Sequence, residues 1–420
     1  MAVDKTIIVT AFGIEIGKLG YDINQRKCLF QYNPEFLESG LYSNMFPYIF
    51  RRVKPVQLFN QFEGETFKGL PPMIADSLPD VFGNIIFQEW FASREKSLKI
   101  TPLEQLTYVA NRGMGVLEYR PVKELPKSSN IDIEEMVQVL VKVLKLKAET
   151  TAEDLSDLSL LNIFKIGTSA GGARPKILVS EHKKSGAIIA GDNVYSDEYN
   201  HYLVKLYMNE EGSYNREKVE YAYYLLAQQI GIDMMPSKLI DDKHFATLRY
   251  DRQNCEKQHV LTVSGLTGWD FKEPENSTYE NVFKLALALK VPHKDLQQLF
   301  KRMVFNLVFR NVDDHLKNHS FIYNKEKNNW NLSPAYDLTY TLNPLLHFTK
   351  TSRALSVNNK RQGIVLKDVL TLASEYVIKH PKGIVEEVQE LTTNWNEIAT
   401  MVGIPEKIIK AIEADFIFLE

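Results

Sequence analysis

Three polar side chains between residues 310 and 340 have the types and spacing needed to transfer the γ-phosphate of ATP. Asp313 precedes Asn318 by five residues, and Asp337 follows two short predicted strands joined by a turn. An aspartate beside an attacking hydroxyl can orient it and accept its proton. An asparagine amide oxygen and a second aspartate can bind Mg²⁺ beside the phosphates. The spacing predicts a catalytic centre of Asp313, Asn318 and Asp337, with Asn318 and Asp337 as the metal ligands.

The neighbouring residues allow other interpretations. Asp314 is also an aspartate, but the spacing to Asn318 favours Asp313 as the base and leaves Asp314 as a structural or exposed carboxylate. His315 and His319 have the spacing of a zinc pair on a helix, yet no H-E-x-x-H motif is present and the loop context opposes a continuous helix. A capped polar turn is the non-catalytic alternative. The helix before the segment and the hairpin leading to Asp337 favour the catalytic interpretation.

A glycine-rich segment, GTSAGGARPK, runs from Gly167 to Lys176. Successive glycines let backbone N–H groups approach an anion, and a basic residue adds charge. The expected ATP contacts there are Gly171, Gly172, Ala173 and Lys176. The segment matches neither G-x-x-x-x-G-K-[ST] nor G-x-G-x-x-G, so a plain glycine-rich β-turn remains open.

Lys205 lies in the middle of an alternating segment, HYLVKLYM, that predicts a strand with Leu203, Lys205 and Tyr207 on one face. A lysine in that position could reach ATP phosphates, although an ordinary exposed strand lysine is the alternative. The helix predicted next offers Glu217 and Glu220 as ion-pair partners for Lys205, with Glu220 preferred.

The elements that must position these residues change in kind along the chain. Short alternating strands dominate the first part, and the remainder from about residue 275 is mainly helical. Gly231 is expected to end the helix that begins near residue 215. The helix before Asp313 is predicted to place one apolar stripe towards the core, made of Leu296, Leu299, Phe300, Met303, Val304, Leu307 and Val308.

Composition excludes several classes of protein. The chain has 420 residues, 44% of them hydrophobic and 25% charged, as in an ordinary soluble globular protein. The net charge of −3 lacks the basic footprint of a stand-alone DNA binder. Cys28 and Cys255 suggest neither a disulfide framework nor a zinc site, which fits a reducing cytoplasm. No apolar run approaches the roughly 20 residues of a membrane span, and the apolar start predicts a buried strand rather than a signal peptide.

Taken together, these segments resemble the HipA family, the kinase toxins of bacterial HipBA-type toxin–antitoxin modules. GTSAGGARPK resembles the family's glycine-rich loop, NVDDHLKNHSFI its catalytic loop, and SPAYDLTYT its metal-binding segment. FQYNPEFLESGL and FKGLPPMIADSLPDVFGN resemble the small domain that precedes the kinase core. The resemblance implies an α+β, bilobal protein kinase-like fold. It has an α/β amino-terminal subdomain at 1–125, a β-rich N-lobe at 126–255 and a helical C-lobe at 256–420.

The resemblance also implies roles for individual residues. It gives Asp313 as the base, Asn318 and Asp337 as Mg²⁺ ligands, and Lys205 as a contact to the ATP phosphates. Because FATLRYDR resembles the hinge strand, residues Leu248, Arg249 and Tyr250 are expected beside the adenine. Some relatives have an acidic residue where this chain has Leu248. Further expected positions are His315 and Lys317 lining the catalytic loop, and Ser169 or, second, Thr168 as the autophosphorylated hydroxyl.

Partners follow from the resemblance as well. It implies a dimeric helix-turn-helix antitoxin of the HipB kind, with DNA contacted only through that partner. The implied substrate is a protein serine or threonine in the translation apparatus, such as an aminoacyl-tRNA synthetase. A small-molecule phosphotransferase is one alternative, against which the FxGLPPxxADSLPDxxG segment argues. A non-catalytic scaffold or co-repressor is another, disfavoured because every expected catalytic position is filled.

Overall fold

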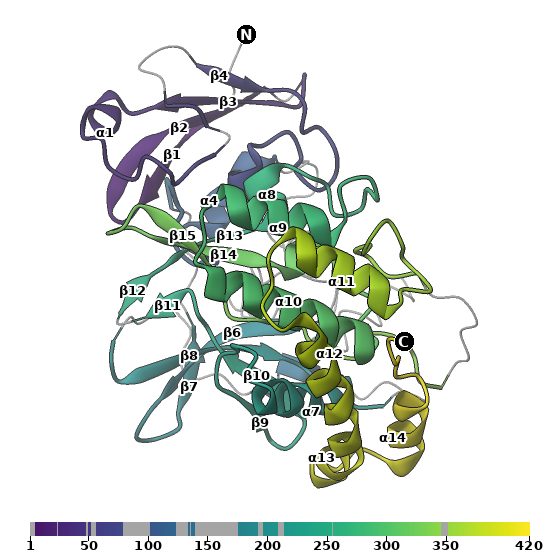
Figure 1. Cartoon of the computed structure of the whole chain (residues 1–420). Coiled ribbons are helices and arrows are strands. Elements are labelled where there is room, and N and C mark those ends of the chain that lie inside the picture. Colours follow the sequence, from purple (N-terminus) through teal and green to yellow (C-terminus); the bar gives the residue numbers. More distant parts are fainter. Residues whose placement is uncertain are drawn as a thin grey trace. The chain divides into compact units, whose positions relative to one another are not determined.

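A computed structural model of the chain describes residues 5–22, 24–47, 49–51, 56–78, 101–122, 133–134, 136–138, 175–191, 196–208, 214–253, 255–345 and 352–420. The chain divides into two compact units. The first comprises Met1–Met208 and Ala246–Leu261, and the second comprises Asn209–Phe245 and Thr262–Glu420. Most of the described strands lie in the first unit and most of the helices in the second (Figure 1). The α+β fold predicted from the sequence is confirmed.

The first unit begins with a five-stranded antiparallel sheet. Its strands hydrogen-bond in the order β4-β3-β2-β1-β5. The bounds are β1 Lys5–Ala11, β2 Ile14–Asp22, β3 Lys27–Tyr32, β4 Gln57–Phe59 and β5 Glu118–Arg120. Phe12 and Gly13 join β1 to β2 with φ angles of 51° and 78°. A two-residue turn with positive φ at both positions matches the twist of paired strands, so the β1–β2 hairpin forms tightly.

Three helices accompany this sheet: α1 Pro34–Glu38, α2 Pro72–Ala75 and α4 Pro102–Val109. Helix α4 begins with a capping box, in which Thr101 and Glu104 satisfy each other's backbone N–H groups. Its buried side chains include Leu103 and Leu106. The capping box at its start and the burial of its apolar side chains therefore stabilise α4 as a short helix of the first unit.

A second sheet in the first unit carries the region of the expected phosphate contacts. Strands β7 (Ile188–Ala190), β6 (Lys176–His182), β8 (Tyr199–Lys205) and β10 (His244–Leu248) hydrogen-bond in that order. Strand β10 carries the chain from the second unit into the first. The short strands β11 (Arg252–Gln253) and β12 (Glu256–Lys257) pair next, before β13 (His259–Thr262) leads back to the second unit.

The second unit opens with α7 (Arg216–Gln229) and β9 (Ser237–Ile240). Gly231 has a φ of 69°, and two bonds close the helix end: Gly231 N–H to Gln228 O at 3.0 Å and Ile232 N–H to Ala227 O at 2.9 Å. This pair of bonds is a Schellman motif. The predicted helix stop at Gly231 is confirmed.

The remaining elements of the second unit are mostly helical (Figure 1). They are α8 Val263–Thr267, α9 Tyr279–Ala288, α10 His293–Val308, η2 Leu316–Asn318, β14 Ser320–Asn324, β15 Asn329–Leu332, α11 Leu366–Glu375, α12 Pro381–Glu390, η3 Leu391–Asn394, α13 Trp395–Met401 and α14 Glu406–Glu413. Helix α10 packs against α9 and α12, and α13 packs against α7 and α14. The predicted apolar stripe of α10 is buried at every position, so that prediction is confirmed.

An aromatic cluster fixes the end of α10. The rings of Phe305 and Phe309 stack at a centroid distance of 4.4 Å, and Tyr223 packs edge-on against both. Trp395 and Phe416 complete the cluster. The Tyr223 hydroxyl donates to Phe309 O at 2.8 Å. Because the predicted catalytic segment starts two residues after Phe309, this close packing sets where that segment begins.

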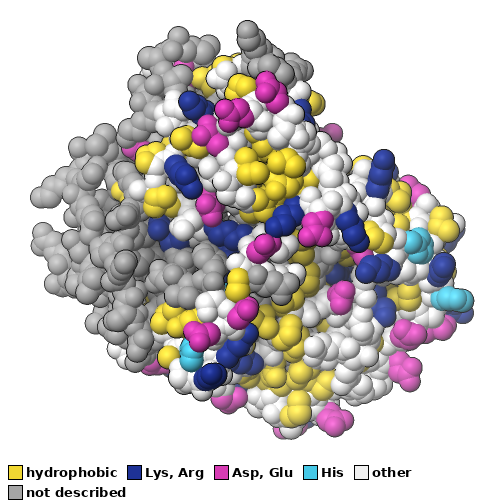
Figure 2. Space-filling model, turned by 90° about the vertical axis from the view of Figure 1, so that its left-hand side faces the viewer, with side chains coloured by type: hydrophobic (Ala, Val, Ile, Leu, Met, Phe, Trp, Pro, Cys, Tyr) yellow, Lys and Arg dark blue, Asp and Glu magenta, His cyan; other side chains and the backbone are white. Residues whose placement is uncertain are grey.

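Among the described residues, no helix combines the length and apolarity needed to cross a membrane. Acidic and basic side chains are interspersed over the described part of the face shown in Figure 2, without a continuous basic stripe. This pattern agrees with the net charge of −3.

Candidate active site

Two buried polar residues of α10 anchor the segment that leads to Asp337. The Asp295 carboxylate accepts from Leu332 N–H at 2.8 Å, and the Arg302 guanidinium donates to Ser333 O at 2.6 Å. Both side chains lie on the apolar face of the helix, 8% and 4% exposed. A buried charge is stable only when it is hydrogen-bonded, so both side chains must keep these bonds. The bonds in turn hold the end of β15 in place.

The loop predicted to be catalytic follows α10. Arg310, with a φ of 57°, redirects the chain, and Asn318 N–H donates to His315 O at 2.8 Å within η2. Asp313 is exposed. The Asn318 side-chain nitrogen donates to Asp313 O at 2.8 Å, which ties the two predicted residues together. The amide oxygen of Asn318 is consequently the atom left to bind a ligand.

Asp337 reaches the same place from the other end of the β14–β15 hairpin. Its φ of 53° is in the left-handed region, an uncommon conformation for a residue with a side chain. Asn318 and Asp337 line one small hollow. The full lining is Arg302, Asn306, Asn311, Asp314, Asn318, His319, Ala335, Tyr336, Asp337 and Leu338.

The oxygen atoms of this pair fit Mg²⁺. An amide oxygen and a carboxylate are ligands that Mg²⁺ accepts, and protein sites usually supply one or two carboxylates while phosphates and water complete the shell. Among the described residues, no group of three or more His, Cys, Asp or Glu gathers to hold a metal. Within the described ranges, His315 and His319 form no such group. Burial lowers the pKa of His319 to about 4, which keeps its ring neutral.

In the first unit, two lysines occupy directly opposed positions. Lys176 of β6 pairs with Lys205 of β8, and both are buried, 3% and 8% exposed. Opposed residues of an antiparallel pair have Cβ atoms roughly 5 Å apart on one face of the sheet. Two like charges directly opposite each other repel, so buried lysines at these positions need negative charge nearby. Each lysine was predicted separately as a phosphate contact, but their opposition depends on strand register.

The expected hinge residues divide between two environments. Leu248 and Tyr250 are half-buried, whereas Arg249 is buried and its backbone N–H donates to His201 O at 2.9 Å. The Arg249 guanidinium makes two bonds to Asp251, at 2.9 and 2.8 Å. That side chain therefore serves a buried ion pair.

The same carboxylate binds a distant loop of the first unit. Asp251 accepts from Arg252 at 2.5 Å and from Gly115 N–H at 2.9 Å, and Arg252 donates to Gly113 O at 3.0 Å. The two arginines hold the pKa of Asp251 well below its usual range against the effect of burial. The loop around residue 115 is thus bonded to the hinge segment.

Phe271 contacts the predicted catalytic loop, and sequence reasoning missed this residue. Its ring lies 4.8 Å from that of His315 between centroids, and Lys317 Nζ lies 5.4 Å from its centre. Both partners were predicted to line the catalytic loop. Nothing in the local spacing of Phe271 signals this contact.

Glu217 and Glu220 were predicted as alternative ion-pair partners of Lys205. Both side chains are buried on α7.

Several predicted residues lie outside the described ranges. They are Thr168, Ser169, Gly171, Gly172 and Ala173 of the glycine-rich segment.

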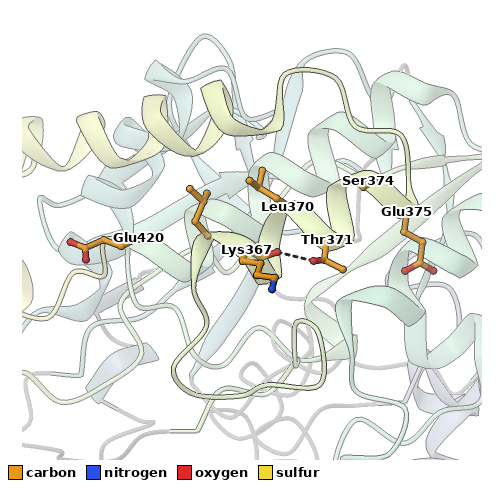
Figure 3. A pocket seen from close by; sticks show the side chains of 7 residues that line it. Lys367, Leu370, Thr371, Ser374, Glu375 and Glu420 are labelled. Atoms are coloured by element: carbon orange, nitrogen blue, oxygen red, sulfur yellow. Dashed lines mark hydrogen bonds between the residues drawn. The ribbon is translucent and has the colours of Figure 1, made fainter.

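A separate open hollow lies along α11, beside Glu420 (Figure 3). Leu366 and Leu370 contribute apolar lining there, and Thr371 donates to Lys367 O at 2.8 Å. None of the predicted site residues lines it.

Among known proteins, one curated relative is "Putative kinase Y4dM" of Sinorhizobium fredii, strain NBRC 101917 / NGR234. It is 23% identical over 195 residues, which span 43% of this chain and 47% of that protein. The chain therefore aligns with about half the length of this relative. Among solved structures, the HipA chain in a complex of Shewanella oneidensis MR-1 HipA, HipB and operator DNA superposes with a TM-score of 0.65. The superposition covers 97% of this chain and 95% of that one at 15% identity, which establishes a shared fold.

Two family models cover most of the chain. The HipA N-terminal domain matches residues 7–120, and the HipA-like C-terminal domain matches residues 168–412. The second match includes both opposed lysines, the predicted catalytic loop and Asp337, and by itself spans more than half of the sequence. The resemblance predicted from the motifs is confirmed, and the chain belongs to the HipA family.

Proposed function

We propose that this chain is an ATP-dependent serine/threonine protein kinase of the HipA type that uses Mg²⁺. One observation carries the proposal: Asn318 and Asp337 line one hollow, and the Asn318 amide nitrogen donates to the backbone of Asp313. The residues proposed as base and metal ligands therefore all lie between positions 313 and 337 of the chain. Phosphoryl transfer needs this kind of positioning more than covalent help.

The chain's own groups would act as follows. The Asp313 carboxylate accepts the proton of a serine or threonine hydroxyl as its oxygen bonds to the γ-phosphorus. The bond from that phosphorus to the β–γ bridging oxygen breaks, and ADP leaves. Bound Mg²⁺ would supply neutralising charge to the phosphate oxygens. Lys176 and Lys205 would contact the phosphates.

Regulation and partners complete the proposal. A phosphate on Ser169 or Thr168 would place about two negative charges in the glycine-rich segment, where ATP phosphates are expected, and would inhibit the kinase. The solved relative is a complex with HipB and operator DNA, which supports a helix-turn-helix antitoxin as partner here. DNA contact through that partner agrees with the net charge of −3. A salt titration of the purified chain with duplex DNA checks this, because direct binding would show a steep salt dependence.

The first test is transfer of label from γ-labelled ATP with Mg²⁺, comparing the parent with Asp313→Asn. Loss of a general base is expected to slow transfer by at least about 100-fold. Asp241→Asn is the matched control, because Asp241 is exposed and its positive φ of 51° suits asparagine. Mass spectrometry should locate label on Ser169 or Thr168.

Two outcomes would contradict the proposal. Equal transfer by the parent and Asp313→Asn would remove Asp313 from the chemistry. A parent protein that neither binds ATP nor transfers phosphate, in a preparation shown to be unphosphorylated, would instead favour a non-catalytic scaffold.

A further inference from the structure

A buried chain of hydrogen bonds lies beneath the catalytic loop and begins at Asp314. Its carboxylate accepts from the Tyr279 hydroxyl at 2.5 Å, from the Arg353 guanidinium at 2.5 Å and from Leu355 N–H at 3.3 Å. Tyr279, Asp314 and Arg353 are at most 5% exposed. Three segments far apart in sequence therefore meet at the residue directly after the predicted base.

The chain of bonds continues to the metal-binding segment. Asn306 donates to the Tyr279 hydroxyl at 3.0 Å, and Asn311 donates to the Asn306 amide oxygen at 2.9 Å. Asn311 also donates to the backbone oxygen of Asp337 at 3.0 Å. The polar route from Asp314 to Asp337 is continuous.

The Tyr279 hydroxyl connects the two parts of this route, because it donates a hydrogen bond to Asp314 and accepts one from Asn306. Burial and the adjacent Asp314 charge raise the pKa of Tyr279 well above its ordinary value, so the donor proton stays in place. Asp337 needs such support, since a left-handed φ of 53° at a residue with a Cβ costs free energy and persists only where its surroundings impose it.

We propose that Tyr279, Asn306 and Asn311 are positioning residues that hold Asp337 in its left-handed conformation and thereby set the affinity of the site for Mg²⁺. The inference rests on the proposed function, because it requires that Asp337 binds the metal. Outer hydrogen bonds of this kind tune metal sites although they never touch the ion. A purely structural role would lower stability and leave the Mg²⁺ dependence unchanged.

Tyr279→Phe tests the inference, since it removes the hydroxyl and keeps the ring. Tyr376→Phe is the matched control: Tyr376 is 4% exposed and donates at 3.1 Å to the backbone of Glu280, the residue after Tyr279. One readout is the Mg²⁺ concentration that gives half-maximal phosphoryl transfer. The other is the Mg²⁺ concentration that gives the half-maximal rise of Tm with a non-hydrolysable ATP analogue, which requires no turnover.

Tyr279→Phe should raise both Mg²⁺ midpoints by about 10-fold, while Tyr376→Phe should change them less than about 2-fold. Asn311→Ser, which removes the donor to Asp337, should show the same increase and serves if Tyr279→Phe does not fold. Unchanged midpoints in a folded variant would overturn the inference while transfer by the parent upholds the kinase. A parent without Mg²⁺-dependent nucleotide binding or transfer would overturn both.

Discussion

Asp313 and Asp314 are neighbours in the chain but lie in opposite environments. Asp313 is exposed on the loop and its backbone oxygen is bonded by Asn318. Asp314 is 1% exposed and accepts three hydrogen bonds, one of them from the buried Arg353. Spacing to Asn318 and the family resemblance were the two grounds in the sequence for preferring Asp313 as the base, and that role stays a prediction. The two adjacent residues therefore have separate predicted roles, Asp313 in the chemistry and Asp314 in stability.

Substitution of each aspartate by asparagine should reveal this separation. Asp314→Asn leaves Arg353 without its buried counter-charge and is expected to lower the free energy of unfolding by about 3–5 kcal/mol. Asp313→Asn alters an exposed side chain and should change it by less than about 0.5 kcal/mol. Urea unfolding of both variants and the parent measures the difference. Equal stability of the two variants would show that the Asp314–Arg353 pair is not maintained in solution.

At the scale of elements, backbone pairing brings separate predictions together. Strands β6 and β8 place Lys176 opposite Lys205, and a register shift of one residue would move one of them to the other face. The end of α7 is equally specific, because Gly231 closes a Schellman motif with a φ of 69°. Local sequence signals were sufficient for the second feature and insufficient for the first.

Gly231→Ala tests the helix end. A Cβ at Gly231 would meet no atom within 4 Å, so the expected loss of about 1 kcal/mol comes from the left-handed backbone alone. Gly383→Ala is the control, since Gly383 lies within α12 and its Cβ would also meet nothing within 4 Å. It should stabilise the protein by up to about 1 kcal/mol. Thermal unfolding measures both, and a shift of the same sign in the two variants would contradict the assignment.

At the scale of the whole molecule, buried neutral histidines make stability depend on pH. Burial lowers the pKa of His259 to about 3 and that of His319 to about 4. Burial and the Arg249 charge lower that of His201 to about 4. The unfolded chain binds these protons below a pH of about 6.5, whereas the folded chain does not. The contribution of these three histidines to the free energy of unfolding is therefore fully present above that pH. It is lost as the pH falls towards about 4.

Between pH 7 and pH 5, the burial of neutral His259 should lower the free energy of unfolding by about 2 kcal/mol. The reason is that pH 5 lies about 1.5 pH units below the pKa of a histidine in the unfolded chain. The variant His259→Gln should lose about that much less than the parent over the same range. His293→Gln replaces an exposed histidine at the start of α10 and should follow the parent. Urea unfolding at both pH values measures each loss. A parent equally stable at pH 5 and pH 7 would refute the assignment.

The sequence by itself determined the family, the α+β fold, the apolar stripe of α10 and the residues to examine at the site. These features depend on residue type and short spacing, which local backbone geometry converts directly into structure. The residues proposed as catalytic could be named for the same reason, because Asp313 and Asn318 lie on one short loop and one hairpin carries the chain to Asp337.

Only the tertiary structure decided which distant groups support that site. Tyr279, Asn306 and Arg353 come from separate segments, and no local spacing links them to Asp314 or Asp337. The hydrogen bond from Gly115 N–H to the Asp251 carboxylate and the opposition of Lys176 and Lys205 likewise depend on packing and strand register. The physical reason is that burial makes an unpaired polar group costly, so the fold selects partners by proximity in space and not by position in the chain.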